Sequence, residues 1–185
     1  MDKNDGICIE IGAYDGIFLS NTLFFENKGW TALCIEPIPD IFKQCKINRK
    51  LCYECCMGEN DSLNEEFTIF NVNGSQSAIS SLEPDSRLIT NLCHDKTLSL
   101  KINVKVRSLN LLLNELQFSK NINFISIDTE NTELDVLKGI DLNVYNVKLF
   151  VIENNFNEAF CEEYLNRFGY TKINRIAVND FYIKE

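Results

Sequence analysis

The chain has 185 residues and a mass of 21.3 kDa, which is the size of one ordinary domain, and we expect a single domain over residues 1–185. Hydrophobic residues make up 45% of it, enough to bury a core without disulfides or a metal. The net charge of −9 disfavours nucleic acids and anionic membranes as partners. No run of about 18 apolar residues occurs and no apolar stretch precedes Ile7, so we expect neither a membrane span nor a secretory signal, and a cytoplasmic location.

Strand-like and helix-like segments alternate through the first third of the chain. Short, nearly unbroken apolar runs predict buried parallel strands at Ile7–Gly12, Thr31–Glu36 and Leu51–Cys56. Between them, Ser20–Lys28 and Pro39–Lys50 have the spacing of helices, and Pro39 suits a first helical turn. This order is typical of an α/β fold that opens a doubly wound, Rossmann-like sheet.

The middle of the chain is less regular. Glu66–Val72 and Leu100–Arg107 alternate in polarity like half-exposed strands, which predicts a small β insertion. Asn73–Asp85 lies between them and is rich in Ser, Gly and Asn, so we expect a mobile loop. A loop of this length is either a binding loop or a merely solvated insertion.

From Ser108, a plausible helix N-cap, the alternation resumes and ends in two consecutive strands. That pair predicts an antiparallel hairpin at one edge of the sheet. The remaining predicted elements are helices at Leu109–Leu116, Thr132–Gly139 and Asn157–Phe168, and strands at Ile122–Asp128, Val147–Glu153, Tyr170–Ala177 and Asp180–Lys184.

Eight cysteines raise the question of a metal site. Cys52, Cys55 and Cys56 form a C-x-x-C-C cluster that Cys93 and His94 could complete as a zinc site, but paired C-x-x-C spacing is absent. The alternative is a set of reduced thiols, which is the default without a secretory signal.

The segment after the first predicted strand reads E-I-G-A-Y-D-G, from Glu10 to Gly16. Tyr14 stands where a dinucleotide fingerprint requires its second glycine, so a pyrophosphate fits poorly. Glu36 ends the second strand, 20 residues after Gly16, where an acid accepts both ribose hydroxyls. The two features together predict an adenosine ligand with an aminoacyl tail, S-adenosylmethionine.

Acidic residues also end the fourth and fifth predicted strands of the sheet. Asp128 and Glu130 follow one of these strands, and Glu153 ends the other, so all three belong to the ligand-binding edge. Three acids on one rim require a cation, a sulfonium or substrate donors to compensate them. The alternative is that Asp128 and Glu130 cap the helix that follows.

These segments together resemble the FkbM-type methyltransferases, a class I family that depends on S-adenosylmethionine. The similarity extends from about Gly6 to about Tyr170 and rests on the motifs E-I-G-A-Y-D-G, C-I-E-P, V-R-S-L-N-L-L-L, I-S-I-D-T-E-N-T-E-L-D-V-L-K-G-I and V-I-E-N-N. It implies a Rossmann-like sheet of about seven strands and methyl transfer, commonly to a hydroxyl of a sugar or polyketide-like acceptor. The family usually has glycine after D-T-E, where this chain has Asn131, a residue that tolerates a left-handed backbone.

The resemblance also implies a role for each site residue. Asp128 and Glu130 would face the methyl group and the acceptor, and Glu36 would hold the ribose. The remaining cofactor contacts would be Glu10, Gly12, Ala13, Tyr14 and Gly16 around the methionine part and Cys56 and Met57 beside the adenine. No helices precede the first strand, so we expect an acceptor pocket that is open or completed by another subunit or a fused domain.

Several functional hypotheses stay open at this point. The first is O-methylation of a sugar, a glycan or a similar small acceptor, with Asp128 as the base and Glu130 orienting the acceptor. His94 is another possible base, and the acids could instead hold Mg²⁺, Mn²⁺ or Ca²⁺. The second hypothesis is a non-catalytic S-adenosylmethionine-binding module in a larger assembly. The third, a nicotinamide-dependent oxidoreductase, is disfavoured by Tyr14 and by the absence of a Tyr-x-x-x-Lys pair.

Overall fold

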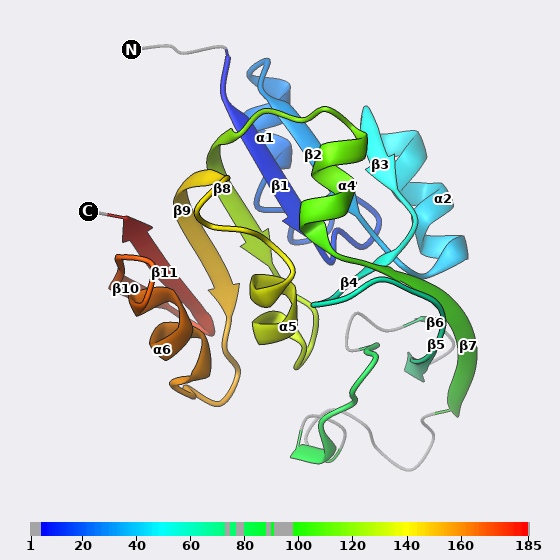
Figure 1. Ribbon diagram of the computed structural model, residues 1–185. Coiled ribbons are helices and arrows are strands. Elements are labelled where there is room, and N and C mark those ends of the chain that lie inside the picture. Colours follow the sequence, from blue (N-terminus) through cyan, green and yellow to red (C-terminus); the bar gives the residue numbers. More distant parts are fainter. Residues whose placement is uncertain (1–4, 73–74, 77–79, 88–89, 91–97, 185) are drawn as a thin grey trace.

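The computed structural model describes residues 5–72, 75–76, 80–87, 90 and 98–184. Seven strands form the main sheet in the order β10-β11-β9-β8-β1-β2-β3, in which β11 runs antiparallel to both neighbours (Figure 1). Their bounds are β1 (Ile7–Ile11), β2 (Thr31–Ile35), β3 (Leu51–Tyr53), β8 (Asn121–Ile127), β9 (Asn146–Glu153), β10 (Tyr170–Ile176) and β11 (Asn179–Lys184). The doubly wound sheet and its C-terminal hairpin are confirmed.

Helices cover both faces of this sheet, with α4 in front of it and α1 behind it in Figure 1. Their bounds are α1 (Leu23–Asn27), α2 (Pro39–Asn48), α4 (Leu109–Glu115), α5 (Glu133–Lys138) and α6 (Phe160–Asn166). Ser108 caps α4 as predicted, because its side chain accepts a hydrogen bond from the Leu111 N–H. None of the helices described is long and apolar enough to cross a membrane.

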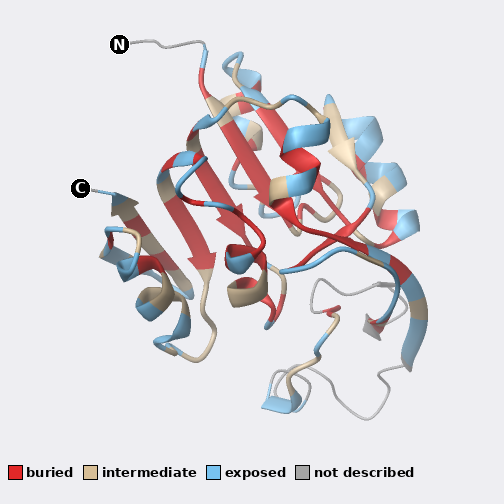
Figure 2. Ribbon diagram, viewed as in Figure 1, coloured by how far each residue is buried: buried red, intermediate tan, exposed pale blue. Residues whose placement is uncertain are grey.

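The central strands are buried on both faces, which explains their unbroken apolar sequences (Figure 2). Alternate residues of β1 belong to different parts of the core. Ile9 and Ile11 pack in the large cluster that includes α4 residues such as Leu112. Cys8 packs on the other side with Phe124, against the partly buried ring of Trp30.

A second, four-stranded sheet confirms the predicted β insertion. It consists of β4 (Cys56–Met57), β5 (Ser62–Val72), β6 (Ser75–Gln76) and β7 (Leu98–Arg107), in the order β4-β7-β5-β6. It lies at the end of the molecule toward which the arrowheads of β1, β8 and β9 point (Figure 1). The small sheet is therefore placed beside the ligand-binding edge of the large one.

The predicted strand Leu51–Cys56 is wrong at its end. The chain leaves the main sheet after Tyr53, and Cys56 instead pairs with Val106 in the small sheet. The sequence does not reveal this break, because residues of one apolar run pack in two different cores. Cys55 packs in the large cluster, whereas Cys56 packs in the cluster beneath the small sheet.

Two predicted helices begin later than the sequence indicated. Helix α1 begins at Leu23 rather than Ser20, because the hydroxyls of Ser20 and Thr22 donate to the Glu10 carboxylate at 2.6 and 2.5 Å. Helix α6 begins at Phe160, three residues after Asn157, whose φ of 55° is left-handed.

Part of the predicted loop Asn73–Asp85 is fixed on the small sheet. Ser81 and Thr68 exchange two backbone hydrogen bonds of 2.9 and 3.1 Å, and the Ser80 hydroxyl accepts from the Phe70 N–H at 3.1 Å. Residues 73–74 and 77–79 of that loop lie outside the described residues, as do Cys93 and His94.

Candidate active site

A cavity of about 170 Å³ opens at the carboxyl ends of β1, β2 and β8, and we refer to it as the cofactor cavity. Every predicted site residue except Gly16 lines it. The predicted residues in its wall are Glu10, Gly12, Ala13, Tyr14, Glu36, Cys56, Met57, Asp128 and Glu130. The wall also contains Asn21, Ser80, Leu82, Ser126 and Glu153, of which only Glu153 was noted in the sequence.

The two glycines of the turn after β1 have different roles, although both are left-handed, with φ of 82° and 80°. A Cβ on Gly12 would lie 1.8 Å from the carbonyl oxygen of Asp128, so no side chain fits there. Gly16 lies away from the cavity, where a Cβ would meet the Arg49 side chain at 2.5 Å. Gly16 is thus not part of the cavity wall, and its contact with the cofactor stays a prediction.

Backbone N–H groups of the same turn are used within the protein. The N–H groups of Gly12 and Ala13 both donate to the Ile35 carbonyl at 3.0 Å, and that of Tyr14 donates to the Glu36 carboxylate at 2.9 Å. A dinucleotide site needs free N–H groups for the pyrophosphate. Their engagement agrees with the prediction from Tyr14 that this ligand fits poorly.

Glu10 lines the cavity, and its carboxylate is used mainly within the protein. Its Oε2 atom accepts from the hydroxyls of Ser20 and Thr22 and from Arg49 at 3.2 Å, and its Oε1 atom accepts from the Asn21 N–H at 2.6 Å. The Oε1 atom, with one donor, retains a further lone pair. Glu10 thus fixes the loop beside the cavity and can still offer one acceptor to a ligand.

Arg49, which the sequence did not single out, joins this network to a second acid. Its side chain is completely buried and pairs with both Glu10 and Glu26. The same guanidinium donates to the Gly16 carbonyl at 3.0 Å and to the Thr22 hydroxyl at 2.7 Å. One arginine therefore ties the glycine turn to the start of α1.

Glu36 is the buried acid at the β2 end of the cavity. Its two carboxylate oxygens accept from the N–H groups of Tyr14 and Ile38, each at 2.9 Å. Burial raises the pKa of Glu36 to about 8, although these two bonds act in the opposite direction. Each oxygen retains a further lone pair, so the carboxylate can accept hydroxyl donors from a ribose.

We expect Glu36 to make stability depend on pH. Its pKa is raised from an ordinary value of 4.5 to about 8 in the folded chain, so its contribution is fully present below about pH 4.5. This contribution is lost progressively as the pH rises toward 8, because the unfolded chain ionises first. Urea denaturation at pH 5, 6.5 and 8 measures the decline, and Glu36→Gln should make it shallower, since other buried acids contribute to the same decline. An unchanged slope in this variant would exclude Glu36 as a source.

The part of the cavity wall beside Glu36 is apolar. Its side chains include Ile38, Cys56, Met57, Phe67 and Leu82, and the small sheet provides Cys56, Met57 and Phe67. A flat, uncharged ring such as adenine suits this environment, next to Glu36, which has the free lone pairs that a ribose would need.

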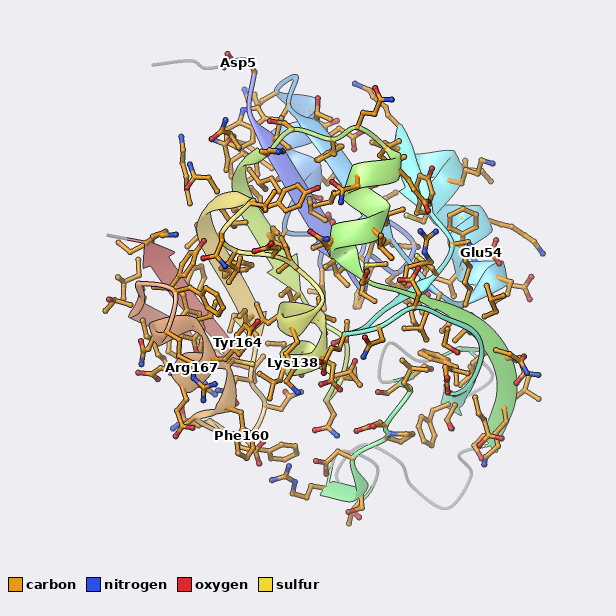
Figure 3. All side chains as sticks on the ribbon, in the orientation of Figure 1. Asp5, Glu54, Lys138, Phe160, Tyr164 and Arg167 are labelled. Carbon is orange, nitrogen blue, oxygen red and sulfur yellow. The ribbon has the colours of Figure 1, made fainter. Side chains whose placement is uncertain are left out.

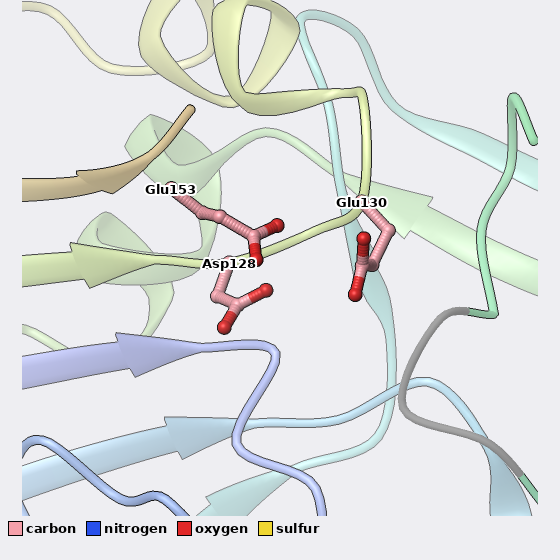
Figure 4. Close-up of side chains that lie close together, drawn as sticks. All are labelled: Asp128, Glu130 and Glu153. Atoms are coloured by element: carbon pink, nitrogen blue, oxygen red, sulfur yellow. The ribbon is translucent and has the colours of Figure 1, made fainter. Parts of the chain in front are cut away.

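Three carboxylates meet where β8 and β9 end (Figure 4). Oxygen atoms of Asp128, Glu130 and Glu153 all lie within 4.8 Å of one another. The backbone that follows Asp128 turns sharply, with φ of 57° at Glu130 and 98° at Asn131. Asn131 thus adopts the left-handed conformation expected of the glycine it replaces.

Burial is the largest cause of a raised pKa at all three acids, and repulsion from neighbouring carboxylates, Glu133 among them, adds to it. Glu130 is buried, whereas Asp128 reaches the water of the cavity although protein surrounds most of its side chain. The Oε2 atom of Glu153 is buried without a hydrogen-bond partner among the described residues. These three carboxylates can therefore accept hydrogen bonds from a ligand or bind a cation.

The alternative for these acids is to cap α5, but Glu133, the first residue of that helix, is the acid that fixes the turn before it. Its Oε1 atom accepts from the N–H and the hydroxyl of Thr129 and from the Asn131 N–H, at 2.9, 3.0 and 3.2 Å. Among the described hydrogen bonds, neither Asp128 nor Glu130 caps α5. Their carboxylates therefore remain available to ligands.

The C-x-x-C-C cluster does not converge on one zinc ion. Cys52 lies 3.6 Å from Cys45, sulfur to sulfur, next to Cys34. Cys55 and Cys56 pack in two other clusters. Over the described part of the chain, the three acids form the one group suited to a metal. The zinc hypothesis is therefore not supported by these three thiols.

The chain is similar to known methyltransferases. The methyltransferase FkbM domain matches residues 10–172 of the chain, and no curated protein matches it. The METTL16 methyltransferase domain is 16% identical, with a TM-score of 0.49, and the match covers 97% of this chain and 58% of that one. M. capricolum TrmK, solved in complex with S-adenosyl-homocysteine, is 10% identical, with a TM-score of 0.45 and coverage of 97% and 61%. The chain thus spans about three fifths of either protein.

From the domain match over residues 10–172, the chain belongs to the FkbM methyltransferase family, whose cofactor is S-adenosylmethionine.

Proposed function

We propose that the chain transfers the methyl group of S-adenosylmethionine to a hydroxyl of a sugar, a glycan or a similar small acceptor. One observation carries the proposal: a single cavity joins the buried carboxylate of Glu36 to the accessible carboxylate of Asp128. The Glu36 carboxylate can accept hydrogen bonds from a ribose, and the Asp128 carboxylate can take the proton of an acceptor hydroxyl.

The residues of the cavity wall support the binding of each part of the cofactor. Phe67 and Met57 offer apolar surface to the adenine, Glu36 accepts from the ribose, and Asp128 lies on the side suited to a positive charge. When bound, the cofactor supplies an electrophilic methyl group. The chain then has to hold the acceptor oxygen in line, about 3 Å from the methyl carbon.

Asp128 is the proposed general base. Its pKa, raised by burial, brings its proton affinity closer to that of a base working near neutral pH. The carboxylate takes the hydroxyl proton while the bond from oxygen to carbon forms. Glu130, two residues later on the same turn, orients the acceptor.

The acceptor side is partly closed by the insertion. Ser80 and Leu82 line the cofactor cavity, and the Ser81 hydroxyl donates to the Thr129 carbonyl at 3.3 Å. These contacts support a role of the insertion in binding the acceptor. A second subunit or a fused domain that completes this side remains part of the proposal.

Calorimetry and labelled transfer test this function. We expect S-adenosylhomocysteine to bind, NAD not to bind, and label from S-adenosylmethionine to appear in at least one member of a panel of sugars and glycosides. Cofactor binding without transfer to any acceptor would favour a non-catalytic module. Binding of NAD instead would overturn the cofactor assignment of the cavity.

Glu36→Gln is expected to weaken S-adenosylhomocysteine binding about tenfold to hundredfold, which is the scale of a hydrogen bond to a charged group, roughly 1.5–3 kcal/mol. The dissociation constant measured by calorimetry checks this. Glu54→Gln is the matched control, because Glu54 is exposed and lies outside the cavity wall (Figure 3). Equal weakening in both variants would remove Glu36 from the ribose site.

A further inference from the structure

A second cavity, of about 280 Å³, adjoins the cofactor cavity, and Glu153 lines both. It lies between α5 and the segment that follows β9. Its wall combines amide side chains with two aromatic rings, which are Asn131, Asn154, Asn155, Phe156 and Phe160. The Asn154 amide is used within the protein, but among the described hydrogen bonds the side-chain oxygens of Asn131 and Asn155 have no donor and can accept from hydroxyl groups. With the aromatic rings beside them, this wall suits a polyhydroxylated ring.

The charged groups that line this space are acidic, and the Arg87 guanidinium lies just outside the wall, 3.6 Å from the centre of the Phe156 ring. The acids of the second cavity are Glu83, Glu133, Asp135, Glu153 and Glu158, and no lysine or arginine of the described chain lines either cavity. Some are compensated: Asp135 pairs with Lys138 at 3.0 Å and Glu158 with Arg87 at 2.9 Å. Glu133 accepts the three hydrogen bonds described above.

The acids at the junction of the two cavities lack such partners. No ion pair of the described residues includes Asp128, Glu130 or Glu153. Glu130 receives one long contact, 3.4 Å from the Asn155 amide, and the Oε2 atom of Glu153 is buried without any partner in the described chain. Without a counter-charge these acids tend to hold protons, in keeping with their raised pKa values, and a bound cation can take the place of those protons.

We propose that the acceptor carries a protonated amino group beside the hydroxyl that is methylated, as an amino sugar does, and that Glu130 and Glu153 bind this group. The inference rests on the proposed function and names its substrate class. During transfer the bond from sulfur to carbon breaks as the bond from oxygen to carbon forms. The hydroxyl proton passes to Asp128, and the ammonium keeps its protons.

The spacing of the carboxylates suits an ammonium group. Such a group has three N–H donors and makes charge-assisted hydrogen bonds of about 2.8 Å. At tetrahedral angles, two acceptors of this kind lie about 4.6 Å apart, which is compatible with the 4.8 Å span of the three carboxylates. A uronate or a phosphate would instead place like charges together.

The test uses protein saturated with S-adenosylhomocysteine and three probes that differ in charge: a methyl glucosaminide, a methyl glucoside and a methyl glucuronide. Calorimetry at pH 6.5 should give at least tenfold tighter binding of the glucosaminide than of the glucoside, and no binding of the glucuronide. The observed heat should also vary with the ionisation enthalpy of the buffer, because a cation drives protons off the acids.

The double variant Glu130→Gln, Glu153→Gln should lose this preference while its affinity for S-adenosylhomocysteine stays within about twofold. Glu66→Gln is the matched control, since Glu66 is exposed and pairs with Lys101 away from both cavities, and it should keep the preference.

Equal affinity for the three probes, including no binding by any of them, overturns the inference, as does a preference that persists in the double variant. Tight binding of Mn²⁺ to the wild type that excludes the glucosaminide would make the three acids a metal site and overturns it as well. In each of these cases bound S-adenosylhomocysteine leaves the proposed function standing. Failure to bind S-adenosylhomocysteine would remove both proposals.

Discussion

Asp128→Asn is expected to lower methyl transfer at least about 100-fold, because the variant cannot take the proton of the acceptor hydroxyl. The fold should survive, since the N–H of Asp128 that donates to the Ile11 carbonyl at 3.0 Å belongs to the backbone. Affinity for S-adenosylhomocysteine should change little. Single-turnover transfer of labelled methyl to the acceptor measures the loss, and calorimetry measures the affinity.

The control for this variant is Asp40→Asn, at an exposed pair with Lys43 on α2. It removes the same charge away from the site and should transfer at the wild-type rate. If Asp128→Asn also retained that rate, the base would have to be another group. A rate loss accompanied by an equal loss of affinity would indicate a binding role instead.

Arg49→Met is expected to cost about 3–5 kcal/mol of folding free energy, the scale for removing one partner of a buried ion pair. The variant leaves Glu10 and Glu26 buried without their counter-charge. It also releases the Gly16 carbonyl, so cofactor affinity should fall together with stability. Urea denaturation gives the free energy of unfolding, and titration with S-adenosylhomocysteine under folding conditions gives the affinity.

Two further variants show whether the charge is the cause. Arg167→Met, at the exposed end of α6, removes the same kind of side chain from the surface and should cost less than about 0.5 kcal/mol (Figure 3). Adding Glu10→Gln and Glu26→Gln to Arg49→Met should recover part of the loss. No recovery would mean that packing, rather than the unpaired carboxylates, accounts for the instability.

Several acids that the sequence placed at the ligand-binding edge lie where strands end. Parallel strands deliver their carboxyl ends to one edge, so the positions of Glu36, Asp128 and Glu153 follow once β2, β8 and β9 are recognised. The left-handed backbone at Asn131 could also be expected, because the residue type is one of the few that accept it.

The remaining features depend on contacts between distant segments. The pairing of Glu10 with Arg49 joins residues 39 positions apart, and no local pattern marks it. Ser80 and Leu82 reach the cavity only because the insertion folds back on β5. Likewise, the break after Tyr53 is decided by which of two cores each following residue enters.

The backbones of Gly12 and Asp128 pass so close that not even a methyl group separates them. Any displacement of one segment must therefore push the other, and the two behave as a single rigid block. The distance between the glycine turn of the cofactor cavity and Asp128, the proposed base, is consequently set before any acceptor substrate binds. An acceptor of different shape can be accommodated only by the surrounding walls, so changes of substrate during evolution or design should be sought there.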